Sequence, residues 1–237
     1  MKWVSKLKLK PDGSVAKYKA RLVPKGFLQQ EGIDYTEVFA LVARIDTVRL
    51  VTVVASSKGW KMAQMDVKSA FLNGPLEKEV YIVQPSGFQK QGRKHLVYRL
   101  RKALYGLKQA PRAWNKLIDA VLAKLGFMKC TVELGVYVKN MSHTNTLIVC
   151  LYVDVLIITG NKDAKFKEKM KAECEMTDLG TLNYFLGLEF VHTPYGVFLH
   201  QKKYAQEILK RFKMEECNEA IILVLPVRPV KLIKLNN

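Results

Sequence analysis

The sequence is poor in acidic residues, in paired cysteines and in long apolar runs. Its 237 residues hold 21 Asp and Glu against 39 Lys and Arg, a net charge of +18. Four cysteines, at positions 130, 150, 174 and 217, show no CxxC spacing, which argues against a zinc site or a disulfide framework and favours a reducing setting. The longest apolar stretch, 147–159, is interrupted by Asp154 and is shorter than the roughly 20 residues needed to cross a bilayer.

A secretory signal is also missing, because Met1 is followed by Lys2-Trp3-Val4-Ser5-Lys6 and not by an apolar segment. We therefore expect an intracellular protein, cytoplasmic or nuclear, with no membrane partner. The positive excess favours a polyanion such as nucleic acid, although a soluble basic protein with solvated lysines has the same composition. The charges are spread along the chain, so composition alone does not decide between these readings.

Apolar periodicity predicts a mixture of strands and helices, and the 49% hydrophobic content is enough for a core. Alternation around the turn Lys10–Ser14 predicts a hairpin. Helical spacing over Asp46–Ala55, with Asp46 as a possible cap, predicts a helix, though its valines leave a strand as a competitor. A clear apolar helix face follows Pro111, with Gly126 just past its end.

Further segments complete an α+β class with antiparallel strands backed by helices. Two strands are predicted to meet at Asp154 as a tight hairpin. After about Cys217 neither period is visible, and 217–237 is interpreted as a divergent tail. The remaining predicted strands are 135–139, 147–153, 155–159, 184–192 and 196–200, and the remaining helices are 163–175 and one carrying Tyr204 to Phe212.

Two aspartates, Asp66 and Asp154, each interrupt an apolar strand-like run. A carboxylate in such a place is costly to bury, so it should reach water, pair with a cation or bind a metal. Taken alone, each could equally be a solvent-facing edge or turn aspartate. Their neighbours along the chain favour the metal.

A series of motifs follows one order and spacing over about residues 1 to 216 and resembles copia-type retrotransposon reverse transcriptases, the RNA-directed DNA polymerase domain of a Pol polyprotein. A series of this length is far more specific than one short motif. The motifs are Lys10–Ser14, Tyr18–Val23, Gly32–Tyr35, Gln64–Gly74, Ala103–Trp114, Tyr152–Asp154, and Asp178–Gly180 leading to Tyr184–Gly187.

The resemblance implies the fingers and palm of a right-hand polymerase, with about 1–60 and 75–110 finger-like and the rest up to 216 palm. It implies template-directed nucleotidyl transfer with two Mg²⁺ or Mn²⁺ ions, deoxynucleoside triphosphates and a primed RNA or DNA template. Asp66 and Asp154 match the family's catalytic and metal-binding carboxylates, with the Val67 backbone carbonyl as a further metal ligand. Oxygen ligands are what such hard ions prefer.

Other positions match the family's substrate contacts. Phe71, five residues after Asp66, would exclude a ribose 2′ hydroxyl, although ordinary core is its reading without the family. Gln109 would lie over the nucleotide, and Lys19 and Arg21 would contact the triphosphate, with solvated strand cations as their alternative. Tyr184, Phe185, Leu186 and Gly187 resemble a primer grip, although the same residues would serve at a sheet edge.

The sequence departs from the family at Val155, where a second aspartate usually follows Tyr-Val-Asp. Valine offers a metal no lone pair and no charge, and the next acid, Asp163, lies beyond the following strand. Pro24 and Leu41 differ as well. The chain also resembles only part of a Pol polyprotein, beginning inside the fingers and ending before a thumb, connection or RNase H segment, without protease or integrase.

Three hypotheses follow. The first is a reverse transcriptase domain, impaired by Val155 and truncation. The second is a non-catalytic remnant that binds nucleic acid through phosphate contacts. The third is a poorly folded remnant without activity. The sequence does not give an oligomeric state.

Overall fold

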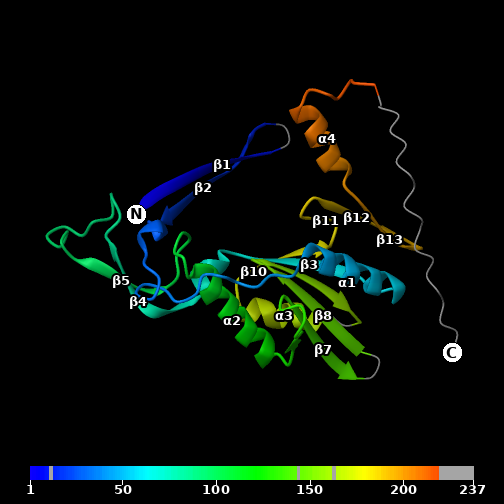
Figure 1. Ribbon diagram of the computed structural model, residues 1–237, viewed down its shortest axis with the longest axis horizontal. Coiled ribbons are helices and arrows are strands. Elements are labelled where there is room, and N and C mark those ends of the chain that lie inside the picture. The colour runs from blue at the N-terminus through cyan, green and yellow to red at the C-terminus, as the bar shows by residue number, and fades with distance from the viewer. Residues whose placement is uncertain (11–12, 143–144, 162–163, 219–237) are drawn as a thin grey trace. The chain divides into compact units, whose positions relative to one another are not determined.

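The computed structural model describes residues 1–10, 13–142, 145–161 and 164–218. Its helices and strands are given below in chain order (Figure 1). The first are β1 (Lys2–Leu9), β2 (Val15–Val23), η1 (Gly26–Leu28), α1 (Ile45–Ser57), β3 (Met62–Val67), η2 (Ala70–Asn73), β4 (Pro75–Val83), β5 (Val97–Lys102) and α2 (Ala110–Lys124). They are followed by β6 (Met128–Lys129), β7 (Val136–Ser142), β8 (Asn145–Tyr152), β9 (Val155–Gly160), α3 (Ala164–Glu173), β10 (Met176–Thr181), β11 (Tyr184–Phe185), β12 (Leu188–Thr193), β13 (Gly196–His200) and α4 (Lys202–Arg211).

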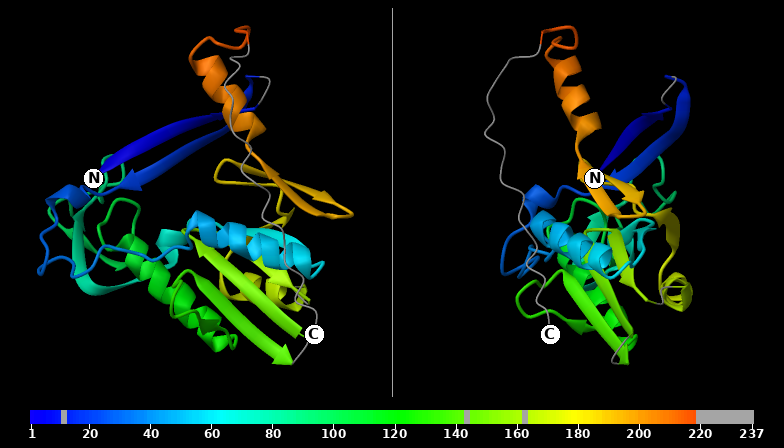
Figure 2. Two further views of the ribbon diagram at one scale, coloured as in Figure 1. Left: turned by 45° about the vertical axis from the view of Figure 1, so that its right-hand side comes forward. Right: turned by 90° about the vertical axis from the view of Figure 1, so that its right-hand side faces the viewer.

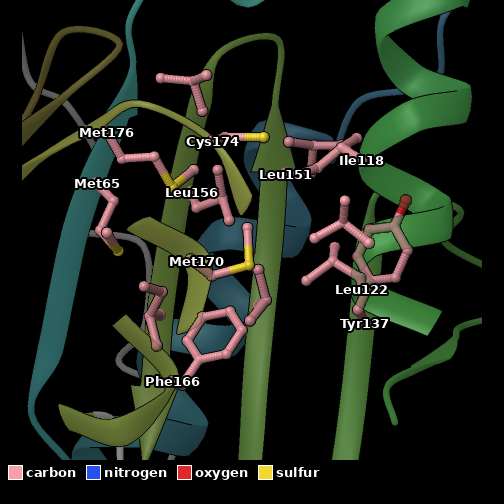
Figure 3. Close-up of a cluster of buried hydrophobic side chains, with 14 of the residues drawn as sticks. Met65, Ile118, Leu122, Tyr137, Leu151, Leu156, Phe166, Met170, Cys174 and Met176 are labelled. Atoms are coloured by element: carbon pink, nitrogen blue, oxygen red, sulfur yellow. The ribbon is translucent and has the colours of Figure 1, made fainter. Parts of the chain in front are cut away.

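A six-stranded antiparallel sheet in the order β10-β3-β9-β8-β7-β6 is the centre of the fold. Side chains of a strand alternate between the two faces. On one face, Met65 and Leu156 pack with Ile118 of α2 and Phe166 of α3 in one buried cluster, the main cluster (Figure 3). Trp114 of α2 belongs to the same cluster. The predicted class, helices with an antiparallel sheet that they back, is thereby confirmed.

The opposite face carries the alternate residues of the same strands. Met62, Cys150 and Ile157 are buried there without belonging to the first cluster. The two views of Figure 2 show α1 on one side of this sheet and α3 on the other. The periodic segment after Asp46 is thus a helix and not the competing strand. Its N-cap is Arg44, however, so the prediction of an Asp46 cap was wrong, and Asp46 lies in the first turn.

Two smaller sheets hold the rest of the first half, β1 with β2 and β4 with β5. A second buried cluster lies under β4, with Val80, Ala103, Leu107 and Ala110. The hairpin predicted around Lys10–Ser14 is present as β1 and β2, while positions 11 and 12 of its turn lie outside the described residues. The β4–β5 pair was not predicted.

The chain divides into two compact units. Among the described residues, the first comprises Met1–Asn183 and Phe190–Phe198, and the second comprises Tyr184–Glu189 and 199–218. The strand predicted over 184–192 was wrong in extent, because a two-residue turn separates β11 from β12, with Tyr184 paired to Glu189 and Phe185 to Leu188. The predicted tail lies almost wholly outside the described residues, as does Asp163.

Helix α4 belongs to the second unit and no residue of it is buried. The Glu189 carboxylate accepts a hydrogen bond from the Lys203 backbone N–H at 2.8 Å, at the start of this helix. That hydrogen bond holds the pKa of Glu189 below its usual range.

Within the described residues, helices are too short or too polar to cross a membrane.

Candidate active site

Asp66 lies in the interior of the six-stranded sheet, on the face away from α2 and α3. Met65 and Val67 point into the buried cluster, so alternation turns Asp66 to the other face, where it is half-buried. In the register of the sheet, Asp66 is opposite Val155 of β9 on one side and Thr177 of β10 on the other.

Asp154 lies in the two-residue turn between β8 and β9, as the sequence predicted. Tyr152 and Val155 are the last paired residues, which leaves Val153 and Asp154 at the turn. Val153 has a positive φ of 56°, a conformation that is rare for a β-branched residue. A positive φ at the first turn position only is the pattern of a type II′ hairpin.

This unfavourable turn is held by hydrogen bonds to both of its carbonyl groups. The Val153 carbonyl accepts from the indole Nε1 of Trp114 at 2.6 Å, and the Asp154 carbonyl accepts from the backbone N–H of Val67 at 2.8 Å. Such outliers cost roughly 1–3 kcal/mol and persist where the surroundings determine them. Trp114 is 2% exposed and lies in the main cluster. Because its indole is held in the core, the hydrogen bond to Val153 fixes the backbone of the turn and thereby the position of Asp154.

The two carboxylates interact electrostatically. Burial raises the pKa of Asp66, the negative charge of Asp154 raises that pKa further, and Lys19 and Lys8 oppose the change. The residues that the sequence assigned to one catalytic centre are therefore brought together.

The β1–β2 hairpin directs cations toward this pair. Because Lys6 is opposite Lys19 and Lys8 is opposite Lys17, these four side chains share one face of the hairpin with Arg21. The pKa of Lys19 is lowered by desolvation and by the neighbouring cations, with Asp66 acting in the other direction. The opposite face is largely apolar, with Trp3, Leu7 and Tyr18 exposed and Leu22 half-buried.

Tyr105 links the hairpin to Phe71. The Arg21 guanidinium lies 4.8 Å from the centre of the Tyr105 ring, and the ring of Phe71 lies 5.0 Å away on a tilted plane. Burial raises the pKa of Tyr105, Arg21 lowers it and Asp154 raises it. Phe71 is half-buried and packs against both buried clusters, so its role at the sugar stays a prediction.

A close backbone approach fixes the position of Tyr105 relative to the hairpin. A Cβ on Gly26 would lie 1.8 Å from the Gly106 carbonyl oxygen, and one on Gly106 would lie 2.4 Å from Val23. Gly106 also has a φ of 106°, which favours glycine. The glycine after Tyr105 is therefore required where the loop passes the end of β2.

Gln109 makes contacts that the sequence did not predict. Its amide accepts a hydrogen bond from Gln29 at 3.0 Å and donates one to the Asp34 carbonyl at 3.2 Å. It thus ties the loop from Gln29 to Asp34 to the start of α2, and nucleotide binding by this side chain stays a prediction.

The proposed primer-grip residues form a tight turn in the second unit. Leu186 and Gly187, with φ of 47° and 82°, are its two central residues. Phe185 is buried, while Tyr184 is 46% exposed and lies 5.5 Å from the Lys203 ammonium. Their role with a primer stays a prediction.

Across the described residues, no group of three or more His, Cys, Asp or Glu side chains is placed to hold a metal. Asp66 and Asp154 nevertheless fit one hard cation, because their mutual repulsion is what such a cation would relieve. Val155, opposite Asp66, is the position at which the family motif predicts a further carboxylate. Tyr105, Trp114 and Lys8 are site residues that sequence reasoning missed. Tyr105 and Trp114 lie in the motif Ala103–Trp114, which marked the segment but not these roles, and the signal for Lys8 was its pairing across the predicted hairpin.

Comparison with known proteins agrees with this geometry. The family model described as Reverse transcriptase (RNA-dependent DNA polymerase) matches residues 1–226, and the chain belongs to this family. It is similar to the Retrovirus-related Pol polyprotein from transposon TNT 1-94 of Nicotiana tabacum, with 42% identity, and to that from transposon RE2 of Arabidopsis thaliana, with 39%. Each match covers 90% of this chain but only 16% and 15%, respectively, of the relative.

Proposed function

We propose that this chain is the fingers and palm of a copia-type reverse transcriptase and that it descends from an enzyme extending a primer along an RNA or DNA template. One observation carries this proposal: the carboxylates of Asp66 on β3 and Asp154 in the β8–β9 turn repel one another, while the cationic face of the β1–β2 hairpin is directed at them. Negative groups for metal ions beside positive groups for phosphates are what nucleotidyl transfer requires.

The roles of individual residues follow from this arrangement. Asp66 and Asp154, with the Val67 carbonyl, would hold Mg²⁺ or Mn²⁺. When bound, such ions stabilise charge on the attacking and leaving oxygens. Lys19 and Arg21 would bind the triphosphate of an incoming deoxynucleotide. Phe71 and Gln109 would contact its sugar, and Tyr184–Gly187 would hold the primer end.

The proposed organisation places residues 1–60 and 75–110 in finger-like parts, the remainder up to 216 in a palm, and 217–237 in a divergent tail. With Val155 in the sequence, the carboxylate cluster has two members and the activity is impaired. The partners would be a primed template, deoxynucleoside triphosphates and the rest of a Pol polyprotein when the chain is part of one.

Template-directed extension by a Val155→Asp chain tests this function. The chain is incubated with a labelled primer on an RNA template, all four deoxynucleotides and Mg²⁺ or Mn²⁺. We expect products whose sequence follows the template and which disappear in the Asp66→Asn, Val155→Asp double variant. Addition that ignores the template, or that survives Asp66→Asn, contradicts the proposal.

A second prediction concerns the choice of sugar by Phe71. In the Val155→Asp chain, Phe71→Ala should raise incorporation of ribonucleotides relative to deoxynucleotides, because the ring no longer blocks the 2′ hydroxyl. Leu76→Ala is the matched control, since Leu76 is also partly buried against the cluster under β4. An unchanged ratio in Phe71→Ala, or an equal change in both variants, makes Phe71 a core residue only.

A non-catalytic nucleic-acid-binding remnant is the alternative, favoured by the apolar Val155 directly opposite Asp66. The hairpin cations would still hold phosphates, as counterion release requires no metal. This alternative predicts that the Val155→Asp chain binds a primed template without extending it.

A further inference from the structure

A long acid-free segment extends from the end of β4 into α2, and its first part, the loop between β4 and β5, is not among the residues of the candidate active site. Between Glu79 and Asp119 there is no Asp or Glu, but there are nine basic residues, namely Lys90, Arg93, Lys94, Arg99, Arg101, Lys102, Lys108, Arg112 and Lys116. Three of the nine are neutralised by acids elsewhere in the chain: Arg99 by Glu79 at 2.7 Å, Arg112 by Glu37 at 2.9 Å and Lys116 by Glu77 at 2.6 Å.

The loop from Gln84 to Leu96, which joins β4 to β5, keeps its charge. Lys90, Arg93 and Lys94 are exposed, and none of them forms an ion pair with a described acid. A run of solvated cations is common on basic proteins, so charge alone does not make this loop a site. Two other features distinguish this loop, namely its hydrogen-bonded conformation and the exposed aromatic rings beside its cations.

The loop has a defined conformation that depends on one buried amide. Gln84 is 7% exposed, and its Nε2 donates to the carbonyls of Arg93 and Leu96 at 2.6 and 2.9 Å. Its Oε1 accepts from the Lys90 backbone N–H at 2.7 Å. The backbone at two of the three cations is therefore fixed by the same side chain, which lowers the entropy cost of presenting them together.

Exposed aromatic rings stand beside these cations. Phe88, within the loop, is 66% exposed, and Trp3 of β1 is 46% exposed with its ring centre 5.7 Å from that of Phe88. Water-exposed rings next to cations are the combination that binds unpaired nucleic acid, since cations follow the backbone and rings stack on bases. A duplex would use only the cations, because its bases are already stacked.

We propose that the loop 84–96, together with Trp3, is a second nucleic-acid contact that binds an unpaired strand. Lys90, Arg93 and Lys94 would contact phosphates, and Phe88 would stack on a base. This contact goes beyond the proposed polymerase function and requires neither a metal nor Asp154. A strand bound here would be held by residues other than those that face Asp66.

Salt dependence of binding tests the charged part. Affinity of the full chain for a labelled single-stranded oligonucleotide is measured by fluorescence anisotropy at several salt concentrations. Each phosphate contact on a single strand contributes about 0.7 to the slope of log K against log salt. The triple variant Lys90→Gln, Arg93→Gln, Lys94→Gln should reduce the steepness of that slope by about 2. The charge-matched control Lys58→Gln, Lys165→Gln, Lys169→Gln, all at exposed positions, should leave the slope nearly unchanged. Equal losses in the two variants overturn the proposal.

Stacking is tested separately with Phe88. Phe88→Ala should weaken single-strand binding about fivefold or more, leave binding of a duplex of the same length unchanged, and be rescued by Phe88→Trp. Equal weakening for single strand and duplex overturns the stacking contact. If polyglutamate competes as well as an oligonucleotide, the loop is instead a surface for an acidic protein. None of these measurements needs primer extension. The proposed strand contact can therefore be contradicted while the polymerase proposal stands, and the polymerase proposal can be contradicted while the strand contact stands.

Discussion

Replacing Val155 with aspartate should raise template-directed primer extension by about 100- to 1000-fold, the range over which a single well-placed electrostatic group acts in an active site. Val155 is the direct partner of Asp66 in the register of β3 and β9. Side chains of such a pair have Cβ atoms about 4.5–5.5 Å apart on the same face. A carboxylate at position 155 would therefore point to the same space as Asp66, next to Asp154.

The rate of extension is compared in the original chain, in Val155→Asp and in Val155→Asn. The asparagine variant matches the shape of aspartate without its charge and should stay close to the original chain. A third carboxylate also increases repulsion, so Val155→Asp should unfold at a lower temperature without metal and recover when Mn²⁺ is added. If the original chain extends as fast as Val155→Asp, the argument for a third carboxylate fails.

Of the substitutions named above and below, removal of the Trp114 side chain should cause the largest loss of stability. Trp114→Ala deletes a nearly fully buried ring from the main cluster, which typically costs about 3–5 kcal/mol. For a domain of this size that corresponds to a fall in melting temperature of roughly 6–20 °C. It also leaves the Val153 carbonyl without its 2.6 Å hydrogen bond, at a turn whose backbone is unfavourable.

Trp114→Phe separates the two effects, because it keeps most of the ring but removes the indole N–H. We expect a smaller loss of stability, about 1–3 kcal/mol for the unsatisfied carbonyl and the reduced packing, together with weaker Mn²⁺ binding as Asp154 loses its fixed position. Trp60→Phe is the control for the same replacement at a half-buried tryptophan whose indole N–H forms no hydrogen bond to a described residue. If Trp114→Phe binds Mn²⁺ as the original chain does, Trp114 supports the core only.

Local patterns predicted most of the long elements. The apolar face after Pro111 is α2, and the interruption at Asp154 is the β8–β9 turn. The β4–β5 pair was not predicted, because Val97–Lys102 is hardly buried and its adjacent like pairs, Val97-Tyr98 and Arg101-Lys102, interrupt the alternation that indicates a strand. The break at Leu186 was also not predicted: Gly187 is a turn residue, but an apolar leucine at the first position of the turn continues the pattern of a strand.

The candidate site shows a similar division. The resemblance of the motifs indicated Asp66, Asp154, Lys19, Arg21 and Phe71, and these residues lie in one electrostatic and aromatic neighbourhood. The support of the turn by Trp114 was not predictable, because it is a contact between residues 39 positions apart that depends on how α2 packs. The link from Gln109 to Gln29, 80 positions away, is of the same kind.

Whether Asp66 and Asp154 form one metal-binding site is measured by a Mn²⁺ titration followed by electron paramagnetic resonance. The original chain should bind one Mn²⁺ weakly. Affinity should rise with pH as the proton leaves Asp66, whose pKa is raised by burial and by Asp154, because the metal and the proton compete for the carboxylate.

Asp66→Asn should abolish this binding without lowering the melting temperature, since it removes a half-buried charge. Asp46→Asn, an exposed aspartate on α1, should leave the binding intact. We expect loss of Mn²⁺ binding in Asp66→Asn and in Asp154→Asn alike, and retained binding in either variant would show that the two carboxylates do not share a metal.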